Sequence, residues 1–168
     1  MKLASKLAIS TLFLSLGAAG TAAAGDLTTE SFTKKAALGG MTEVELGKLA
    51  QDKAENQQVK DFGEMMVEDH GAANEKLKEL AESEGWTLPT TLDSEHKSHI
   101  EDLAGKNGSE FDRAYIDLMV EDHKKDVELF EQASESDSVD ESVQQFAAET
   151  LPTLQKHLST VEQIDSNL

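Results

Sequence analysis

The spacing of apolar residues is the feature that most constrains how this chain can fold. In four long stretches, apolar side chains recur at intervals of three and four residues, which places them along one face of an α-helix. Alanine, leucine, glutamate and lysine are abundant and there are only two prolines, a composition that favours helix throughout. The pattern therefore predicts an all-α domain in which each helix buries one apolar stripe against the others.

The predicted long helices run from about Glu30 to Glu55, Gln57 to Glu84, Ser109 to Glu135 and Ser138 to Asp165. A connection of about 24 residues separates the second from the third and includes a short helix from Ser94 to Leu103, whereas the other connections are short. These lengths fit a ferritin-like four-helix bundle whose middle link crosses the length of the bundle. An up-and-down bundle, with the middle segment covering one end, is the alternative.

Three local features bear on the helix boundaries. Gly39-Gly40 either weakens the first helix or marks a close helix crossing, and a helix that restarts at Thr42-x-x-Glu45, which has the form of a capping box, is the alternative. A similar box, Ser109-x-x-Asp112, is expected to start the third long helix. Pro152 lies inside the fourth, where it removes a backbone donor, so we expect a kink or two shorter helices.

A sequence of five residues occurs twice in the chain. Met66-Val67-Glu68-Asp69-His70 recurs unchanged as Met119-Val120-Glu121-Asp122-His123. Each copy is near the middle of its helix, so both lie at the same height in a bundle whichever way the helices run. His70 and His123 fall on the apolar stripes, and Asp69 and Asp122 are rotated by about 100° toward the edge. The repeat therefore predicts a polar layer across the middle of an apolar bundle.

Further ionisable residues are expected at the height of this layer, namely Glu43 and Glu45 in the first helix and His157 in the fourth. Imidazole nitrogen and carboxylate oxygen suit zinc, iron, manganese or copper. One hypothesis is therefore a transition-metal site drawn from His70, Asp69, His123, Asp122, Glu43, Glu45 and His157. The alternative is a structural network in which each acid partners a histidine and fixes the register of the bundle. A di-iron centre is disfavoured because the chain contains no Glu-x-x-His.

The chain shows no catalytic signature. It has no cysteine, no G-x-S-x-G elbow, no P-loop and no Rossmann glycine pattern, so no catalytic residue is predicted. Asp93-x-x-His96-x-x-His99 in the short helix is a second group of metal-binding residue types, but it is typical of solvated helix faces. The first functional hypothesis is a non-enzymatic binding or stress-related module, and the alternative is a metal-binding or metal-dependent redox protein.

The N-terminus has the composition of a secretory signal peptide. Lys2 and Lys6 accompany an apolar stretch from Leu7 to Leu16 that is too short to span a bilayer, and Ala22-Ala23-Ala24 supplies a small-residue cleavage site. We expect residues 1–24 to be removed after Ala24 and residues 25–168 to form a single helical-bundle domain in the periplasm. No later segment has the pattern of a transmembrane span, and an uncleaved N-terminal anchor is the alternative.

The chain is strongly acidic. Its 33 acidic and 15 basic residues give a formal net charge of −18, which becomes −20 without residues 1–24 because these contain two lysines and no acid. Nucleic acid is therefore not expected as a partner. A saline environment that screens the charge and an acidic surface kept for solubility both account for this composition.

The order of several motifs resembles a known bacterial family. These motifs include Ala36-Ala37-x-Gly39-Gly40-Met41, Glu43-Val44-x-Leu46-Gly47, Leu88-Pro89 and Leu151-Pro152-x-Leu154-x-x-His157, together with both copies of Met-Val-x-Asp-His. This arrangement resembles the family called domain of unknown function 4142, whose members are exported proteins grouped with ferritin-like bundles and often labelled as outer membrane proteins. The resemblance implies a fold and a compartment, but no activity, cofactor or protein partner. Any association with the outer membrane is expected to be peripheral at most.

Overall fold

A computed structural model describes residues 27–168, and the predicted signal peptide, residues 1–24, lies outside the described residues. This part of the chain consists of α1 (Thr29–Lys53), α2 (Gln57–Glu84), α3 (Ser94–Ala104), α4 (Gly108–Glu135) and α5 (Glu141–Asp165), without any strand. The predicted all-α fold is confirmed. Within residues 27–168, no helix combines the length and the apolar composition needed to cross a bilayer.

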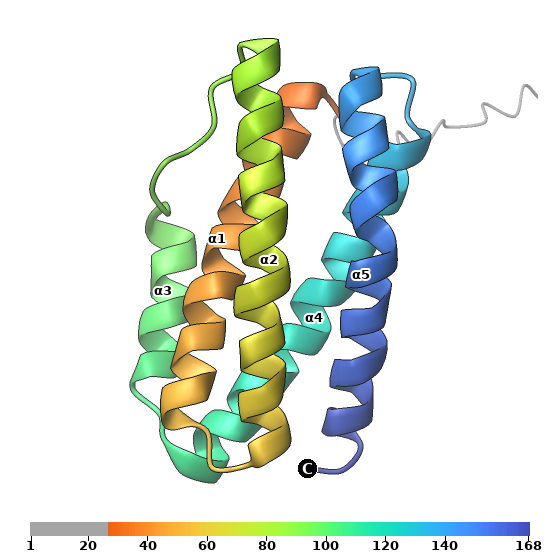
Figure 1. Cartoon of the computed structure of the whole chain (residues 1–168). Coiled ribbons are helices and arrows are strands. Elements are labelled where there is room, and N and C mark those ends of the chain that lie inside the picture. The colour runs from red at the N-terminus through yellow and green to blue at the C-terminus, as the bar shows by residue number, and fades with distance from the viewer. Residues whose placement is uncertain (1–26) are drawn as a thin grey trace, which may run out of the picture.

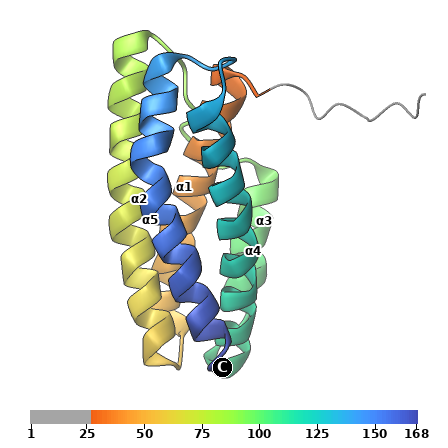
Figure 2. The ribbon, with the colours of Figure 1, turned by 90° about the vertical axis from the view of Figure 1, so that its right-hand side faces the viewer.

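The four long helices form a bundle with ferritin-like connections. α1 and α2 are antiparallel neighbours, and so are α4 and α5 (Figure 1). The link between α2 and α4 runs along the length of the bundle and contains α3, so α2 and α4 point in the same direction (Figure 1). Figure 1 and Figure 2 show α3 outside the four long helices, where it packs against α1 and α4. The predicted crossover is therefore confirmed, and the up-and-down alternative is wrong.

Side chains at the helix ends explain where the helices begin and stop. Thr28 caps α1 through a reciprocal pair of hydrogen bonds with Ser31, and Asn56 caps α2 by accepting from the backbone N–H of Gln58. α2 ends at Gly85, whose φ of +76° lies in the left-handed region that glycine adopts without strain. The predicted boundaries of all five helices agree with the structure to within three residues.

Asp112 has a different role from the one expected. The proposed Ser109-x-x-Asp112 capping box is wrong, because α4 begins directly after Asn107. The Asp112 carboxylate, which is 3% exposed, instead accepts hydrogen bonds from the backbone amides of Glu55 and Asn56 at 3.1 and 2.8 Å. Asp112 thereby ties the α1–α2 loop to α4.

Two predicted interruptions of helices do not occur. The Thr42 hydroxyl donates to the carbonyl oxygen of Leu38 at 2.7 Å within a continuous α1, so the alternative of a helix that restarts after Gly39-Gly40 is wrong. α5 is also one helix that contains the exposed Pro152, which contradicts the expectation of two shorter helices. The contacts that α5 makes with the other helices stabilise it by more than the loss of the single backbone hydrogen bond that proline removes.

The close crossing of α1 and α2 is made by a different pair of glycines from the one proposed. A Cβ atom on Gly47 would lie 2.5 Å from the carbonyl oxygen of Gly63, and one on Gly63 would lie 2.7 Å from Cβ of Ala50. Gly40 instead packs against the side chain of Asn74. Backbone contact between Gly47 and Gly63 therefore sets the separation of these two helices.

The core consists of two apolar clusters with a polar layer between them. One cluster lies toward the α1–α2 loop and the C-terminus and includes Leu46, Phe62, Met66, Tyr115, Ile116, Met119 and Val161. The other lies toward the opposite end and includes Phe32, Leu77, Phe130, Val143, Phe146 and Leu154. The buried ionisable residues between them are Glu43, His70, His123 and His157. The predicted polar layer is confirmed.

Candidate metal centre

Three histidines from three helices meet in the middle of the bundle. His70 on α2, His123 on α4 and His157 on α5 are 6%, 0% and 0% exposed, and the centroids of their rings are 5.4 to 5.7 Å apart. One ring nitrogen of each histidine lies within 4.8 Å of those of the other two. The layer therefore presents three nitrogen donors to one another in a region shielded from solvent.

Each imidazole ring has one nitrogen next to an oxygen atom. Nδ1 of His123 donates a hydrogen bond to the carbonyl oxygen of Met119 at 2.9 Å, and Nε2 of His157 donates one to Oδ2 of Asp69 at 2.8 Å. Nδ1 of His70 lies 2.8 Å from Oε2 of Glu43. The opposite nitrogens, Nε2 of His70, Nε2 of His123 and Nδ1 of His157, have no hydrogen-bond partner among residues 27–168. Metal-binding histidines have this arrangement, because the second ring nitrogen is usually held by a carboxylate or a carbonyl group.

Glu43 brings a buried carboxyl group from α1 into the same layer. Glu43 is 3% exposed, and its Oε1 lies 3.5 Å from Nδ1 of His123. Neither of its oxygens forms a well-directed hydrogen bond with any described residue, since the short approach of His70 is poorly aligned. Burial raises the pKa of Glu43 to about 7, and the nearby His123 partly opposes this shift. The fold thus leaves a strong acceptor unsatisfied beside the histidines.

Burial also favours the neutral form of the histidines. It lowers the pKa of His157 to about 4, although the hydrogen bond to Asp69 acts in the opposite direction. Burial likewise lowers the pKa of His70 and of His123, opposed by the charges of nearby acids. Neutral imidazole is the form that binds metal ions. Near neutral pH, the layer therefore holds three neutral imidazoles beside the carboxyl group of Glu43.

The structure separates the predicted acidic residues into different roles. Glu45 is exposed and pairs with Lys48 at 2.7 Å, so the expectation that it joins the layer is wrong. The reason is geometric, because two residues along a helix correspond to a rotation of about 200°. The Asp122 side chain is 25% exposed and lies 3.7 Å from Lys125, at the edge of the layer. Asp69 contacts His157 and so orients a histidine.

Asp126 was missed by the sequence reasoning. It is partly buried on α4, three residues after His123 and therefore on the same helical face. Burial raises the pKa of Asp126 well above its usual range, and the charge of Glu43 adds to this shift. The residue that corresponds to Asp126 in the first copy of the repeat is Ala73, so the repeat does not indicate an acid at this position.

Aromatic side chains close the layer on the side of the C-terminal apolar cluster. The ring of Phe62 lies edge-on to those of His123 and His157, with centroids 5.9 and 6.3 Å apart. Behind it, Tyr115 is fully buried and stacks on Phe111 at 5.7 Å. Bulky apolar rings thus exclude water from this side of the histidines.

The second group of metal-binding residue types does not form a comparable centre. Asp93 caps α3 by accepting hydrogen bonds from the backbone amide and Nδ1 of His96, at 3.1 and 2.7 Å. His99 is exposed. Across residues 27–168, the His70, His123 and His157 cluster is the one group of at least three such side chains with ligand atoms this close together.

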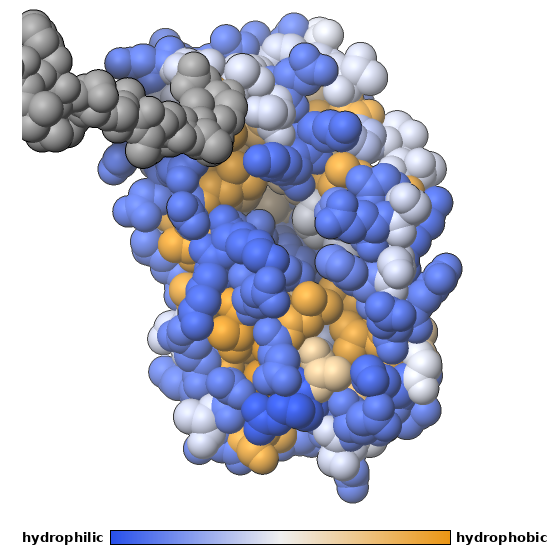
Figure 3. All heavy atoms as spheres, turned by 180° about the vertical axis from the view of Figure 1, so that it is seen from behind, coloured by the Kyte–Doolittle hydropathy of each residue, from blue (hydrophilic) through white to orange (hydrophobic). Residues whose placement is uncertain are grey.

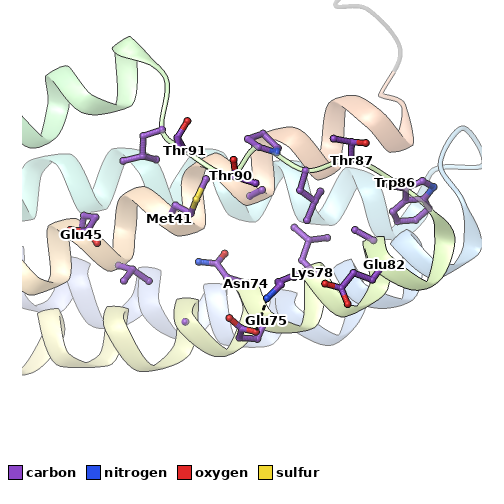
Figure 4. A pocket seen from close by; sticks show the side chains of 18 of the residues that line it. Met41, Glu45, Asn74, Glu75, Lys78, Glu82, Trp86, Thr87, Thr90 and Thr91 are labelled. Atoms are coloured by element: carbon purple, nitrogen blue, oxygen red, sulfur yellow. Dashed lines mark ion pairs between the residues drawn. The ribbon is translucent and has the colours of Figure 1, made fainter.

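Two hollows lie near the layer. A cavity of about 20 Å³ is lined by Glu43, His70 and Asp126 together with residues from all four long helices. A larger, mostly apolar cavity of about 930 Å³ lies between α1, α2 and the link that follows α2. Figure 4 shows its walls, with Met41 on α1, Asn74 on α2 and Trp86 on the link. The small cavity is therefore the one in contact with the polar layer.

The fold and the layer together define a ferritin-like bundle with a buried three-histidine centre. The profile of the family described as Domain of unknown function (DUF4142) matches residues 15–164, and the chain belongs to this family. No curated protein matches the sequence at a significant level.

Several solved structures are similar to this chain. A DUF305 fragment from Deinococcus radiodurans is similar with a TM-score of 0.72 and 12% identity, over 83% of this chain and 96% of that one. A DUF305 protein from Streptomyces coelicolor has a TM-score of 0.67 and 10% identity, over 82% and 91% of the two chains. CopM in its Cu(II)-bound form has a TM-score of 0.69 and 15% identity, over 84% and 98%. Similarity at these identities shows a shared fold.

Proposed function

We propose that this protein binds one transition-metal ion through His70, His123 and His157, with the carboxyl group of Glu43 beside them next to Nδ1 of His70. The observation that carries the proposal is that each of these three clustered histidines has one buried ring nitrogen without a hydrogen-bond partner among residues 27–168. A purely structural network would pair such atoms with one another, because an unsatisfied buried polar group costs about 1 to 3 kcal/mol. A bound cation would satisfy all three histidines at once.

The types of ligand favour a borderline divalent cation. Three imidazoles suit Cu(II) and Zn(II), and among divalent first-row ions a site of this kind binds Cu(II) most tightly. The fold shared with CopM, which has been seen in Cu(II)-bound, Cu(I)-bound and Ag-bound forms, supports testing copper first. The carboxylates of Glu43 and Asp126 would also offset the two positive charges of the ion.

A binding role accounts for the burial of the centre better than a catalytic one. The three histidines are 0% to 6% exposed, and the adjoining cavity of about 20 Å³ holds about one water molecule. A substrate would have no room beside the ion. We therefore propose storage or transfer of the ion, with no catalytic residue.

We also propose that the protein acts in the periplasm as a single domain of residues 25–168. The composition of residues 1–24 supports this location. Intact-mass measurement on the periplasmic fraction should find a chain that begins near Gly25, and attachment to the outer membrane, if present, should be released by salt. Recovery of the full-length chain in the cytoplasmic fraction alone would contradict export.

Metal analysis of the protein purified from the periplasm without a His tag tests the proposed function. We expect about one equivalent of copper or zinc, and loss of this metal when His70→Gln and His123→Gln are combined. The matched control combines His96→Gln and His99→Gln in the solvated α3 and should keep the metal. Less than about a tenth of an equivalent after copper and zinc are added back, in a protein with a normal helical circular dichroism spectrum, would contradict the proposal.

A further inference from the structure

The burial of the centre raises the question of how a cation reaches it. Glu43, His70, His123 and His157 are all at most 6% exposed. α1 and α2 form one closely packed pair and α4 and α5 another, and the two pairs meet along α1–α4 and α2–α5. A route into the layer must therefore pass between the two pairs.

The small cavity lies on such a route. Glu43, His70 and Asp126 are the ionisable residues of its wall, and Gly39 and Gly40 of α1 form part of the remainder. Seen from behind, the surface is largely hydrophilic and is hollowed near the middle of the face, on the side of the bundle that α4 occupies (Figure 3). Asp126 is partly exposed and Glu43 is buried, so carboxyl groups lead from the surface inward.

Gly39 leaves the opening of this cavity clear. No atom of the described chain lies within 4 Å of the position that a Cβ atom on Gly39 would occupy. At the neighbouring Gly40, in contrast, the side chain of Asn74 occupies the space that a Cβ atom would take. On the opposite side of the layer, Oδ2 of Asp69 accepts a hydrogen bond from Nε2 of His157, so this carboxylate is the partner of a histidine.

We propose that Glu43 and Asp126 form a cation-binding subsite in this cavity, reached past Gly39, where a divalent cation is held before it passes to the three histidines. The proposal rests on the proposed metal-binding function and adds the route and the residues that serve it. Carboxylate oxygens bind divalent cations that still carry water, and the histidines then replace that water. The two unpartnered oxygens of Glu43, which face both the cavity and the histidines, supply the connection.

Stopped-flow measurement of Cu(II) loading and release tests the route. Gly39→Leu should slow both rates by about tenfold and leave Kd unchanged, because an obstructed path affects both directions equally. Gly71→Leu is the matched control, since Gly71 is also helical with no described atom within 4 Å of a Cβ position but lines the large cavity instead. Gly39→Ala, with a smaller side chain, should give an intermediate effect.

Asp126→Asn tests the subsite itself. We expect loading to slow by about threefold, because one attracting charge is lost, while the visible spectrum of the bound Cu(II) stays unchanged. A changed spectrum would make Asp126 a permanent ligand and overturn the subsite. Rates in Gly39→Leu equal to those of the wild type, with binding intact, would overturn the route alone, whereas absence of Cu(II) binding by the wild type would overturn the proposed function and the subsite together.

Discussion

Glu43 is the residue whose surroundings are hardest to explain by packing. It is 3% exposed, and an aliphatic side chain of similar size would fill the same space without a polar group to satisfy. Its carboxyl group nevertheless lies within 3.5 Å of two histidine nitrogens. Stability alone does not favour a buried carboxyl group at this position, whereas a function in ion binding explains it.

Glu43→Gln should change how the stability of the metal-free protein depends on pH. The folded pKa of about 7 is above the ordinary value of 4.5, so between these values the folded state holds a proton that the unfolded state has released. The stability of the wild type therefore falls as pH rises through this window, by up to about 1.4 kcal/mol per pH unit from this group. Glu43→Gln lacks this loss and should gain stability relative to the wild type from pH 4.5 to 7, as measured by urea unfolding.

A difference in stability between Glu43→Gln and the wild type that stays constant across this pH range would contradict the account of Glu43. The same variant should bind Cu(II) more weakly, because it loses the negative charge next to the histidines and the carboxylate beside Nδ1 of His70. A gain in stability together with a loss of affinity is the combination that distinguishes a binding residue from a structural one.

Asp69→Asn should weaken metal binding without unfolding the bundle. The Asp69 side chain is 33% exposed and accepts a hydrogen bond from His157, so it orients the ring and increases its basicity. Losing such a partner typically lowers metal affinity by about 10- to 100-fold. Calorimetric titration with Cu(II) checks this, with Glu68→Gln at the neighbouring exposed position as the control. Equal affinities for the two variants would show that Asp69 has no such role.

The candidate histidines can be found from the sequence because they share the apolar stripes of their helices, which the fold must bury. The same stripe distinguishes Glu43 from Glu45, but both were retained as candidates because both are central in α1. Asp126 is not apparent, since the repeat places Ala73 at the equivalent position. Which ring nitrogen stays free depends on contacts such as His157 with Asp69, which are 88 residues apart.

At the scale of helices, the small residues at the α1–α2 crossing set how closely this pair approaches. Gly47→Ala should destabilise the protein by about 1 to 3 kcal/mol, since the new Cβ would overlap the backbone of Gly63. Gly71→Ala should instead stabilise it by up to about 1 kcal/mol, because alanine favours helix and this position has open space in the described chain. Urea unfolding of both variants measures the change in the free energy of unfolding. Similar changes for the two substitutions would contradict the role of Gly47 in the close contact between α1 and α2.

Helix boundaries were predictable where the signal is local. Asn56 at the start and Gly85 at the end of α2 act on neighbouring backbone groups, and the predicted range of this helix is the observed one. Asp112 was misassigned because its partners lie in a loop more than 50 residues earlier in the chain. The alternative of two shorter helices around Pro152 was wrong, since tertiary packing keeps α5 continuous there.

At the scale of the whole molecule, the net charge of −18 opposes compaction. The Debye length shortens from about 30 Å at 0.01 M salt to about 3 Å at 1 M, so added NaCl should screen repulsion between surface carboxylates. The melting temperature of the metal-free protein should therefore rise over this range, as followed by circular dichroism at 222 nm. A melting temperature that is independent of salt would show that the charges are too dispersed to matter.

The central claim is that the layer of His70, His123, His157 and Glu43 is a metal site rather than a scaffold. Thermal unfolding of the wild type and of the combined His70→Gln and His123→Gln variant, each with and without Cu(II), tests this most directly. We expect free Cu(II) at a hundred times Kd to stabilise the wild type by about 2.7 kcal/mol and to leave the variant unaffected, while the two metal-free proteins have similar stability. A wild type that does not respond to Cu(II), together with a metal-free variant weakened by several kcal/mol, would contradict it.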